Sequence, residues 1–305
     1  MSSDHHHASS SRRVLLLALS LTLLFAVIEA LAGWYSGSIA LLGDAGHMLT
    51  DGLSLGIAAF AATLALRAPS KRHSYGLGRV ELLAALLNAL FMIAVVVAIS
   101  IAAVERLVNP QPVKGETVTL VAFIGLLINI LVAWLLTRSE NNINVRAAFL
   151  HVLGDLLGSI AALVSGVVIT VTGWNPIDPI LSLVIVMLIL FSSLRLLRDG
   201  LHLLLDGVPN NINLQAVGKA LAGLDGILEV HDLHIWSLSA ERNALSAHLV
   251  IDDLAHWQQH LSAARNLVNE QFHIDHCTFQ PELRTASSSL LQIKEPYRTD
   301  STTMD

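Results

Sequence analysis

The sequence predicts an α-helical membrane protein with six transmembrane helices and a small C-terminal α/β domain. Of its 305 residues, 53% are hydrophobic and only 14% are charged, and the mean hydropathy is +0.61. Soluble domains carry about 25% charged residues, so this composition indicates a chain that lies largely in a bilayer. Six apolar stretches reach the length of about 20 residues that a membrane-spanning helix needs, and a segment of mixed character follows them.

The apolar stretches divide the chain into a membrane part and a C-terminal part. The predicted spans are 14–34, 39–66, 81–104, 118–136, 145–171 and 179–197. The first is too long for the core of a signal peptide and contains Glu29, so we interpret it as a retained span. The domains expected from this division are a disordered tail over 1–12, a membrane domain over 13–200, a hinge over 201–208, a cytoplasmic domain over 209–283 and a disordered tail over 284–305.

Basic residues are concentrated in alternate loops. Arg12 and Arg13 precede the first span, and the connection RAPSKRHSYGLGR after the second span is strongly basic, whereas the loops YSGS and WNPIDP contain no Lys or Arg. Because basic loops stay on the cytoplasmic side, we expect both termini and the C-terminal domain to be cytoplasmic.

The C-terminal domain alternates helical and extended patterns. Helical spacing covers 213–224 and 257–272, and strand character covers 228–238, 244–251 and 277–281. The order α-β-β-α-β predicts a small open-faced sandwich, which is too short to form an enzyme core with a deep cleft.

A His-x-x-x-Asp motif occurs twice within the predicted spans, as His47 with Asp51 and as His151 with Asp155. Residues four apart lie on one face of a helix, one turn apart. Two such helices facing each other would offer two imidazoles and two carboxylates, a set that suits tetrahedral Zn²⁺. Ionisable groups at membrane depth are costly and usually functional, so the sequence predicts a zinc site within the bilayer.

The same four side chains also bind protons. A metal ion needs neutral histidine and ionised aspartate, so protons and zinc compete for such a site, and the ordinary pKa of histidine, about 6.5, lies in the working range. This competition predicts antiport, in which zinc is loaded from the cytoplasm and displaced by protons on an acidic side, with the site alternately open to each face. The donors favour Zn²⁺ over Mn²⁺ or Mg²⁺, and Cd²⁺, Co²⁺ and Ni²⁺ are further candidate cargo.

Other polar residues occur within the predicted spans. Asp44 lies about one turn before His47 and has two interpretations, a residue that orients a histidine ligand or a structural group. Glu29, Asn88 and Asn129 are interpreted as polar contacts between helices or as lining of a cavity.

The stretch SGSIALLGDAGHMLTDGLSLG, the second motif HVLGD, the six spans and the small C-terminal domain together resemble the cation diffusion facilitator family, in its bacterial zinc-transporting branch. The resemblance covers about 12–282. It implies a homodimer in the bacterial inner membrane that exports Zn²⁺ from the cytoplasm in exchange for H⁺, and therefore a transporter rather than an enzyme. It also implies that the C-terminal domains dimerise and bind regulatory zinc.

The resemblance also bears on residues outside the spans. His231 and His248 match cytoplasmic zinc ligands of the family, and His260 matches a third. The family's final His-x-Asp pair is replaced here, so we expect a reduced site that uses His231, His248 and Glu282, with exposed histidines that bind nothing as the alternative.

Asp206, just before the C-terminal domain, lies where the family has a charged residue that pairs with the loop after the second span. Arg79 is the expected partner, and a salt bridge between them would hold the hinge.

Two other functions remain open from the residues, a membrane-embedded metalloenzyme and a metal sensor. The sequence has no His-Glu-x-x-His motif, no Walker motif and no phosphorylatable Asp-Lys-Thr-Gly motif. The net charge of −6 and the lack of a recognisable motif argue against nucleic acid as a partner. The single cysteine, Cys277, can form neither an internal disulfide nor a thiolate cluster.

Overall fold

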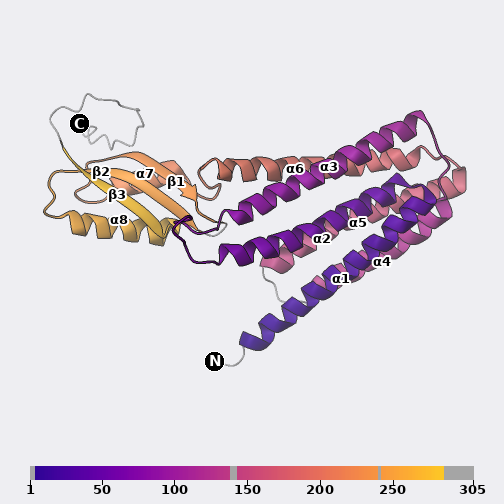
Figure 1. The fold of residues 1–305 in the computed structure, drawn as a ribbon, viewed down its shortest axis with the longest axis horizontal. Helices are drawn as coiled ribbons and strands as arrows, with labels where there is room; N and C mark the ends of the chain where they lie inside the picture. The colour runs from indigo at the N-terminus through magenta and orange to yellow at the C-terminus, as the bar shows by residue number, and fades with distance from the viewer. Residues whose placement is uncertain (1–3, 138–142, 240–241, 285–305) are drawn as a thin grey trace, which may run out of the picture. The chain divides into compact units, whose positions relative to one another are not determined.

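The computed structural model describes residues 4–137, 143–239 and 242–284, without the side chains of 4–16, 143–148, 150 and 151 (Figure 1). The chain forms two compact units. The first comprises Met1–Ala59 and Ala85–Leu197, and the second comprises Phe60–Ala84 and Arg198–Asp305.

Six long helices carry the predicted spans. They are α1 (Asp4–Ser36), α2 (Ile39–Ala65), α3 (Val80–Val108), α4 (Gly115–Thr137), α5 (Ile143–Thr172) and α6 (Ile177–Leu204). Each contains a segment long and apolar enough to cross a membrane, so the six-span prediction is confirmed.

Two helix ends differ from the bounds expected from the sequence. Helix α1 begins at Asp4, within the segment expected to be a disordered tail, and residues 4–12 contain no glycine or proline that would interrupt it. Helix α6 continues to Leu204, into the expected hinge. It ends where Asp206 adopts a positive φ of 58° and the Gly207 N–H donates to the carbonyl of His202. The expected C-terminal tail lies outside the described residues except for Arg284.

Helix α4 packs closely against α5 and also against α1. A Cβ atom on Gly166 of α5 would lie 2.6 Å from the backbone nitrogen of Thr119, and one on Gly115 of α4 would lie 2.8 Å from that of Thr170. The two backbones are therefore in contact, which is the usual role of small residues between membrane helices.

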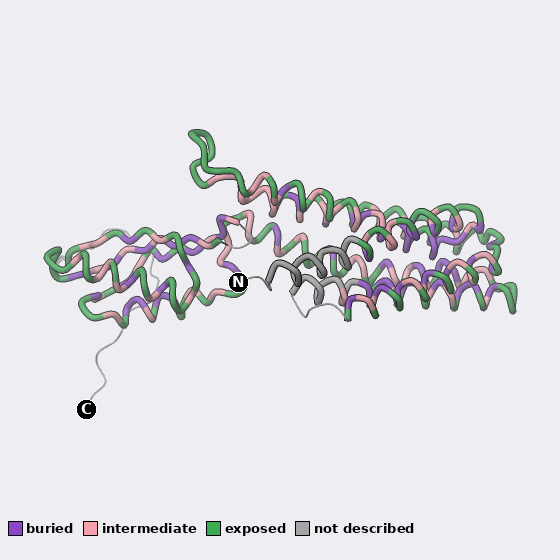
Figure 2. The backbone as a smooth tube through the Cα atoms, turned by 90° about the horizontal axis from the view of Figure 1, so that it is seen from below, coloured by how far each residue is buried: buried purple, intermediate pink, exposed green. Residues whose placement is uncertain are grey.

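Figure 2 shows buried and exposed residues alternating along the helices. Large apolar side chains such as Phe191 are exposed, which suits contact with lipid.

The C-terminal domain has the predicted order of elements. They are α7 (Leu214–Ala222), β1 (Glu229–Ser237), β2 (Asn243–Ile251), α8 (Trp257–Phe272) and β3 (His276–Leu283). The sheet order is β1-β2-β3, with β1 antiparallel and β3 parallel to β2. The two helices pack on the sheet through buried residues such as Val217, Leu221 and Val268. The predicted α-β-β-α-β domain is confirmed.

Local sequence explains the ends of these elements. Asn213 caps α7, because its side-chain oxygen accepts a hydrogen bond of 3.0 Å from the N–H of Ala216. Strand β1 contains a bulge between His231 and His234, where Asp232 has a φ of 50°. The bulge turns Asp232 out of the regular alternation of the strand.

We predict that the α4–α5 contact does not tolerate a side chain at Gly166. Gly166→Val should destabilise the protein by about 1–3 kcal/mol, because the new atoms would overlap the backbone of α4. The melting temperature of the purified full-length protein in detergent measures this. Gly56→Val is the matched control, since a Cβ atom at Gly56 of α2 meets nothing within 4 Å. Equal melting temperatures for the two variants would contradict the close packing.

Candidate functional site

The first pair of the repeated motif lies on α2. His47 Nδ1 is 3.3 Å from Asp51 Oδ2, one turn further along the helix. About 20% of each side chain is exposed, so both are largely enclosed by the bundle. The spacing of four residues thus places the imidazole and the carboxylate together, as the helical pattern predicts.

Helix α5 brings a second carboxylate to the same histidine. Asp155, which is 2% exposed, has its Oδ1 atom 3.8 Å from His47 Nε2. The structure therefore brings three of the four predicted residues together from two helices. The fourth, His151, lies one turn before Asp155 on α5, and its side chain is outside the described part of the chain.

The distances around His47 suit a small metal ion. They are longer than ordinary N–H···O hydrogen bonds. Ligand atoms with bonds of about 2.0–2.1 Å to a tetrahedral zinc lie roughly 3.3 Å from one another, which is close to the separations of 3.3 and 3.8 Å found here. A cation on His47 Nδ1 would have Asp51 Oδ2 within reach, and a cation on His47 Nε2 would have Asp155 Oδ1 within reach.

Two further buried carboxylates lie near this group. Asp44 of α2 is 3% exposed and rests against α5, where a Cβ atom on Gly158 would lie 2.7 Å from its Oδ1 atom. Glu29 of α1 is fully buried and within electrostatic range of Asp44 and Asp155. Within the described part of the chain, neither carboxylate oxygen of Glu29 has a hydrogen-bond partner. Buried carboxyl groups so near one another favour a bound proton or metal ion among them.

Glu29 was expected to be an interhelical contact or cavity lining, and its proximity to the motif aspartates was not predicted. Its only sequence signal is an acidic residue inside the first span. By contrast, the two asparagines do make contacts between helices. The amide of Asn129 donates to Ser159 Oγ at 3.0 Å, and Asn88 accepts a hydrogen bond from Ser54.

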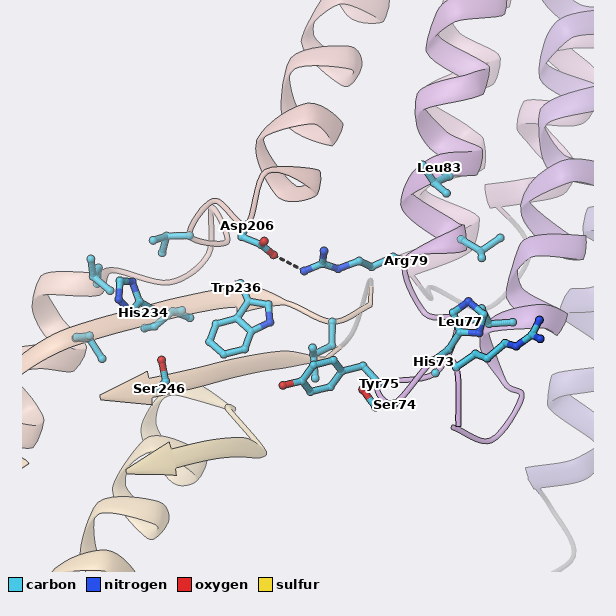
Figure 3. Close-up of a pocket in the computed structure, with 18 residues that line it drawn as sticks. His73, Ser74, Tyr75, Leu77, Arg79, Leu83, Asp206, His234, Trp236 and Ser246 are labelled. Carbon is cyan, nitrogen blue, oxygen red and sulfur yellow. Dashed lines mark hydrogen bonds and ion pairs between the residues drawn. The ribbon is translucent and has the colours of Figure 1, made fainter. Parts of the chain in front are cut away.

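The expected salt bridge at the hinge is present in the second unit. The Arg79 guanidinium donates to Asp206 Oδ1 (Figure 3). The pair borders a cavity of about 940 Å³ that is also lined by Tyr75, His234 and Trp236. Both side chains are partly exposed, so the pair contributes at most about 1 kcal/mol to stability.

The C-terminal domain contains a second group of candidate ligands, His231, His248 and Glu282. Their ligand atoms all lie within 4.8 Å of one another. Glu282 Oε2 is 2.9 Å from His231 Nε2, and Glu282 Oε1 is 2.7 Å from His248 Nδ1. The sheet register creates the group, because His231 on β1 lies opposite His248 on β2, and β3 places Glu282 beside them.

Asp232 is a neighbour of this group that the sequence did not reveal. Its Oδ2 atom is 3.5 Å from His248 Nε2, and its Oδ1 atom is 2.9 Å from His234 Nε2. The hydrogen bond with His234 lowers the pKa of Asp232, and the neighbouring histidines act in the same direction. Strand alternation could not predict this position, because the bulge in β1 reorients it.

His260, the remaining candidate, is not part of the group of three ligands among the described residues. It lies on α8, where its ring rests against Gly226 and is 6.5 Å from the ring of His256.

Comparison with family models gives two matches that together cover most of the chain. Residues 15–205 match a cation efflux transmembrane domain, and residues 209–283 match the cytoplasmic domain of cation efflux proteins.

Individual relatives are similar over most of their length. The chain is 43% identical to the zinc transporter ZitB of Yersinia pestis, over 88% of this chain and 86% of the relative. It is 38% identical to ZitB of Escherichia coli (strain K12), over 92% of this chain and 90% of the relative. It is also 38% identical to a cadmium, cobalt and zinc/H(+)-K(+) antiporter of Bacillus subtilis (strain 168), over 88% of each chain.

Proposed function

Because this chain belongs to the cation efflux family of cation diffusion facilitators, we propose that it exports Zn²⁺ from the cytoplasm in exchange for H⁺ through one site in its membrane helices. The observation that carries the proposal is the position of His47 between carboxylates of α2 and α5. The relatives are named as transporters and antiporters, so the chain is a transporter, and the enzyme and sensor interpretations lose their support.

The proposed ligands are His47, Asp51, His151 and Asp155. Two imidazoles and two carboxylates suit a borderline cation such as Zn²⁺, and suit oxygen-seeking Mg²⁺ poorly. Cd²⁺ and Co²⁺ fit the same donors, and both are named with zinc for the Bacillus subtilis relative. The four ligands include no thiolate. Zinc should therefore bind less tightly than at a site with cysteine ligands, which allows the transporter to release it.

Exchange for protons follows from the chemistry of these ligands. Zinc binds neutral imidazole and ionised carboxylate, so each ion that enters displaces protons from the site. Glu29 and Asp44 add two buried carboxyl groups near it, which can hold protons beside the site. The name of the Bacillus subtilis relative includes H⁺ exchange, and this supports the same coupling here.

The direction of transport and the setting are part of the proposal. The basic loops favour cytoplasmic termini, which puts the C-terminal domain on the side from which zinc is taken. Relatives from Yersinia pestis and Escherichia coli support the inner membrane of a bacterium as the location. The match of 209–283 to the cytoplasmic dimerisation domain of the family supports a homodimer.

Zinc flux in proteoliposomes tests this function. With an imposed pH gradient, the wild-type protein should move Zn²⁺ toward the acidic side, and the rate should rise with the gradient. Asp51→Ala should reduce the flux at least about a hundredfold, because it removes a charged ligand from the site. Asp199→Asn, a carboxylate of α6 outside the site, is the control and should retain the flux.

Two results would contradict this proposal. Undiminished Zn²⁺ flux in Asp51→Ala would contradict the assignment of the site. Flux that does not respond to the pH gradient would contradict the exchange for protons.

We propose as a second function that the C-terminal domain binds a regulatory Zn²⁺ through His231, His248 and Glu282. The support is their convergence within 4.8 Å, since two imidazoles and a carboxylate are suitable zinc donors. Three protein ligands leave one position for water or for a neighbouring group. Asp232, whose Oδ2 atom is 3.5 Å from His248 Nε2, is close enough to orient that ring.

Removing Glu282 tests the second site. In full-length protein whose membrane site is disabled by Asp155→Asn, adding Glu282→Gln should weaken zinc binding at least about tenfold in a competition titration. Glu270→Gln, an exposed position of α8, is the control. Binding should also weaken as the pH falls from about 7.5 to about 6, because protons compete for the imidazoles. Asp232 should not contribute to this loss, since its lowered pKa keeps it ionised there. Equal affinities with and without Glu282 would contradict the site.

A further inference from the structure

Asp178, at the start of α6, binds the beginning of a different helix. It is fully buried. Its Oδ1 atom accepts a hydrogen bond of 2.6 Å from Ser38 Oγ, and its Oδ2 atom accepts one of 2.6 Å from the N–H of Ile39. Ile39 is the first residue of α2, so this carboxylate caps the helix that carries His47 and Asp51.

The cap satisfies groups that a helix cannot satisfy by itself. The first N–H groups of any helix lack partners within it, and negative charge is favourable at that end. Ser38 also contributes, because its Oγ atom accepts from the N–H of Leu41 at 3.2 Å while donating to Asp178. Both carboxyl oxygens of Asp178 accept hydrogen bonds at this point, so one side chain holds two donors at the start of α2.

The same carboxylate also reaches α5. Ser165 Oγ donates to Asp178 Oδ1 at 3.3 Å. Asp178 therefore connects α2, which carries His47, with α5, which carries Asp155. With a rise of 1.5 Å per residue, these connections lie about 12 Å from His47 along α2 and about 15 Å from Asp155 along α5.

Neighbouring contacts hold the loops at this end of the bundle. Arg106 donates to the carbonyl of Gly37 at 2.8 Å, and the N–H of Lys114 donates to the carbonyl of Ser36 at 3.0 Å. These contacts fix the turn between α1 and α2. They do not connect α2 with α5, which is the connection that Asp178 makes.

We propose that Asp178 is a positioning residue for transport, which sets the separation of His47 and Asp155 by fixing α2 relative to α5. The inference rests on the proposed membrane site. Helices transmit a small displacement of their ends along their length, and errors of about 1 Å at a reacting site can cost about a hundredfold in rate. Loss of the cap should therefore alter the metal site without any change in a ligand.

Metal preference distinguishes positioning from simple stability. Zn²⁺ forms short bonds of about 2.0–2.1 Å to nitrogen and oxygen, whereas the larger Cd²⁺ accepts ligands that lie further apart. Asp178→Asn replaces one acceptor oxygen by an NH₂ group and leaves only one acceptor oxygen for two helices. We expect the KM for Zn²⁺ to rise about tenfold and the Zn²⁺ to Cd²⁺ ratio of kcat/KM to fall about fivefold or more.

The experiment compares Zn²⁺ and Cd²⁺ flux in proteoliposomes for wild type, Asp178→Asn and Ser182→Ala. Ser182 is the matched control, because it is buried one turn further along α6 and its hydroxyl donates only to the carbonyl of Asp178 in the same helix. Ser182→Ala should leave the Zn²⁺ to Cd²⁺ ratio of kcat/KM unchanged. Where Asp178→Asn does not yield folded protein, Ser38→Ala, which removes one donor, should shift the ratio in the same direction by a smaller factor.

Several results would overturn the inference. An unchanged Zn²⁺ to Cd²⁺ ratio of kcat/KM in Asp178→Asn would show that Asp178 only stabilises the protein. An equal loss of Zn²⁺ and Cd²⁺ flux together with a lower melting temperature would show the same. These outcomes leave the proposed function intact, because they require a wild-type protein that transports zinc. A folded wild type that moves neither metal would instead refute the proposed function.

Discussion

Polar groups buried among membrane helices must be paired with one another or with a bound cation, because the bilayer offers them no water. Two groups of buried carboxylates in this protein meet that requirement in different ways. Asp178 is surrounded by donors from Ser38, Ile39 and Ser165. Asp155, Asp44 and Glu29 instead lie within electrostatic range of one another. The first arrangement holds helices together, and the second suits a cation that enters and leaves.

The close approach of the helices makes both arrangements possible. Gly166 and Gly115 bring the backbones of α4 and α5 into contact, and Gly158 leaves the space on α5 that the Asp44 carboxylate occupies. The packed α5 brings Asp155 Oδ1 to 3.8 Å from His47 Nε2. The C-terminal domain applies a similar principle in a sheet, where the register of three strands, rather than a helical turn, brings His231, His248 and Glu282 together.

Local periodicity predicted the features that depend on neighbours in the sequence. Apolar length identified the six spans, and a spacing of four residues placed His47 beside Asp51. The contact between Asp178 and Ser38 joins residues far apart in the chain, and no local pattern indicates it. Asp232 was missed because a strand bulge reorients it. The proximity of Glu29 to Asp44 and Asp155 was missed because these residues belong to other helices, and the sequence does not show how the helices pack.

The central claim is that zinc is bound in the membrane by imidazole and carboxylate. X-ray absorption spectroscopy at the zinc edge tests this most directly, on full-length Glu282→Gln protein loaded with one equivalent of Zn²⁺. We expect about four nitrogen and oxygen ligands, with outer-shell scattering from two imidazole rings. Sulfur is not expected, because burial raises the pKa of the only thiol, Cys277, and keeps it protonated. A sulfur ligand, or zinc without any imidazole, would rule out this binding site.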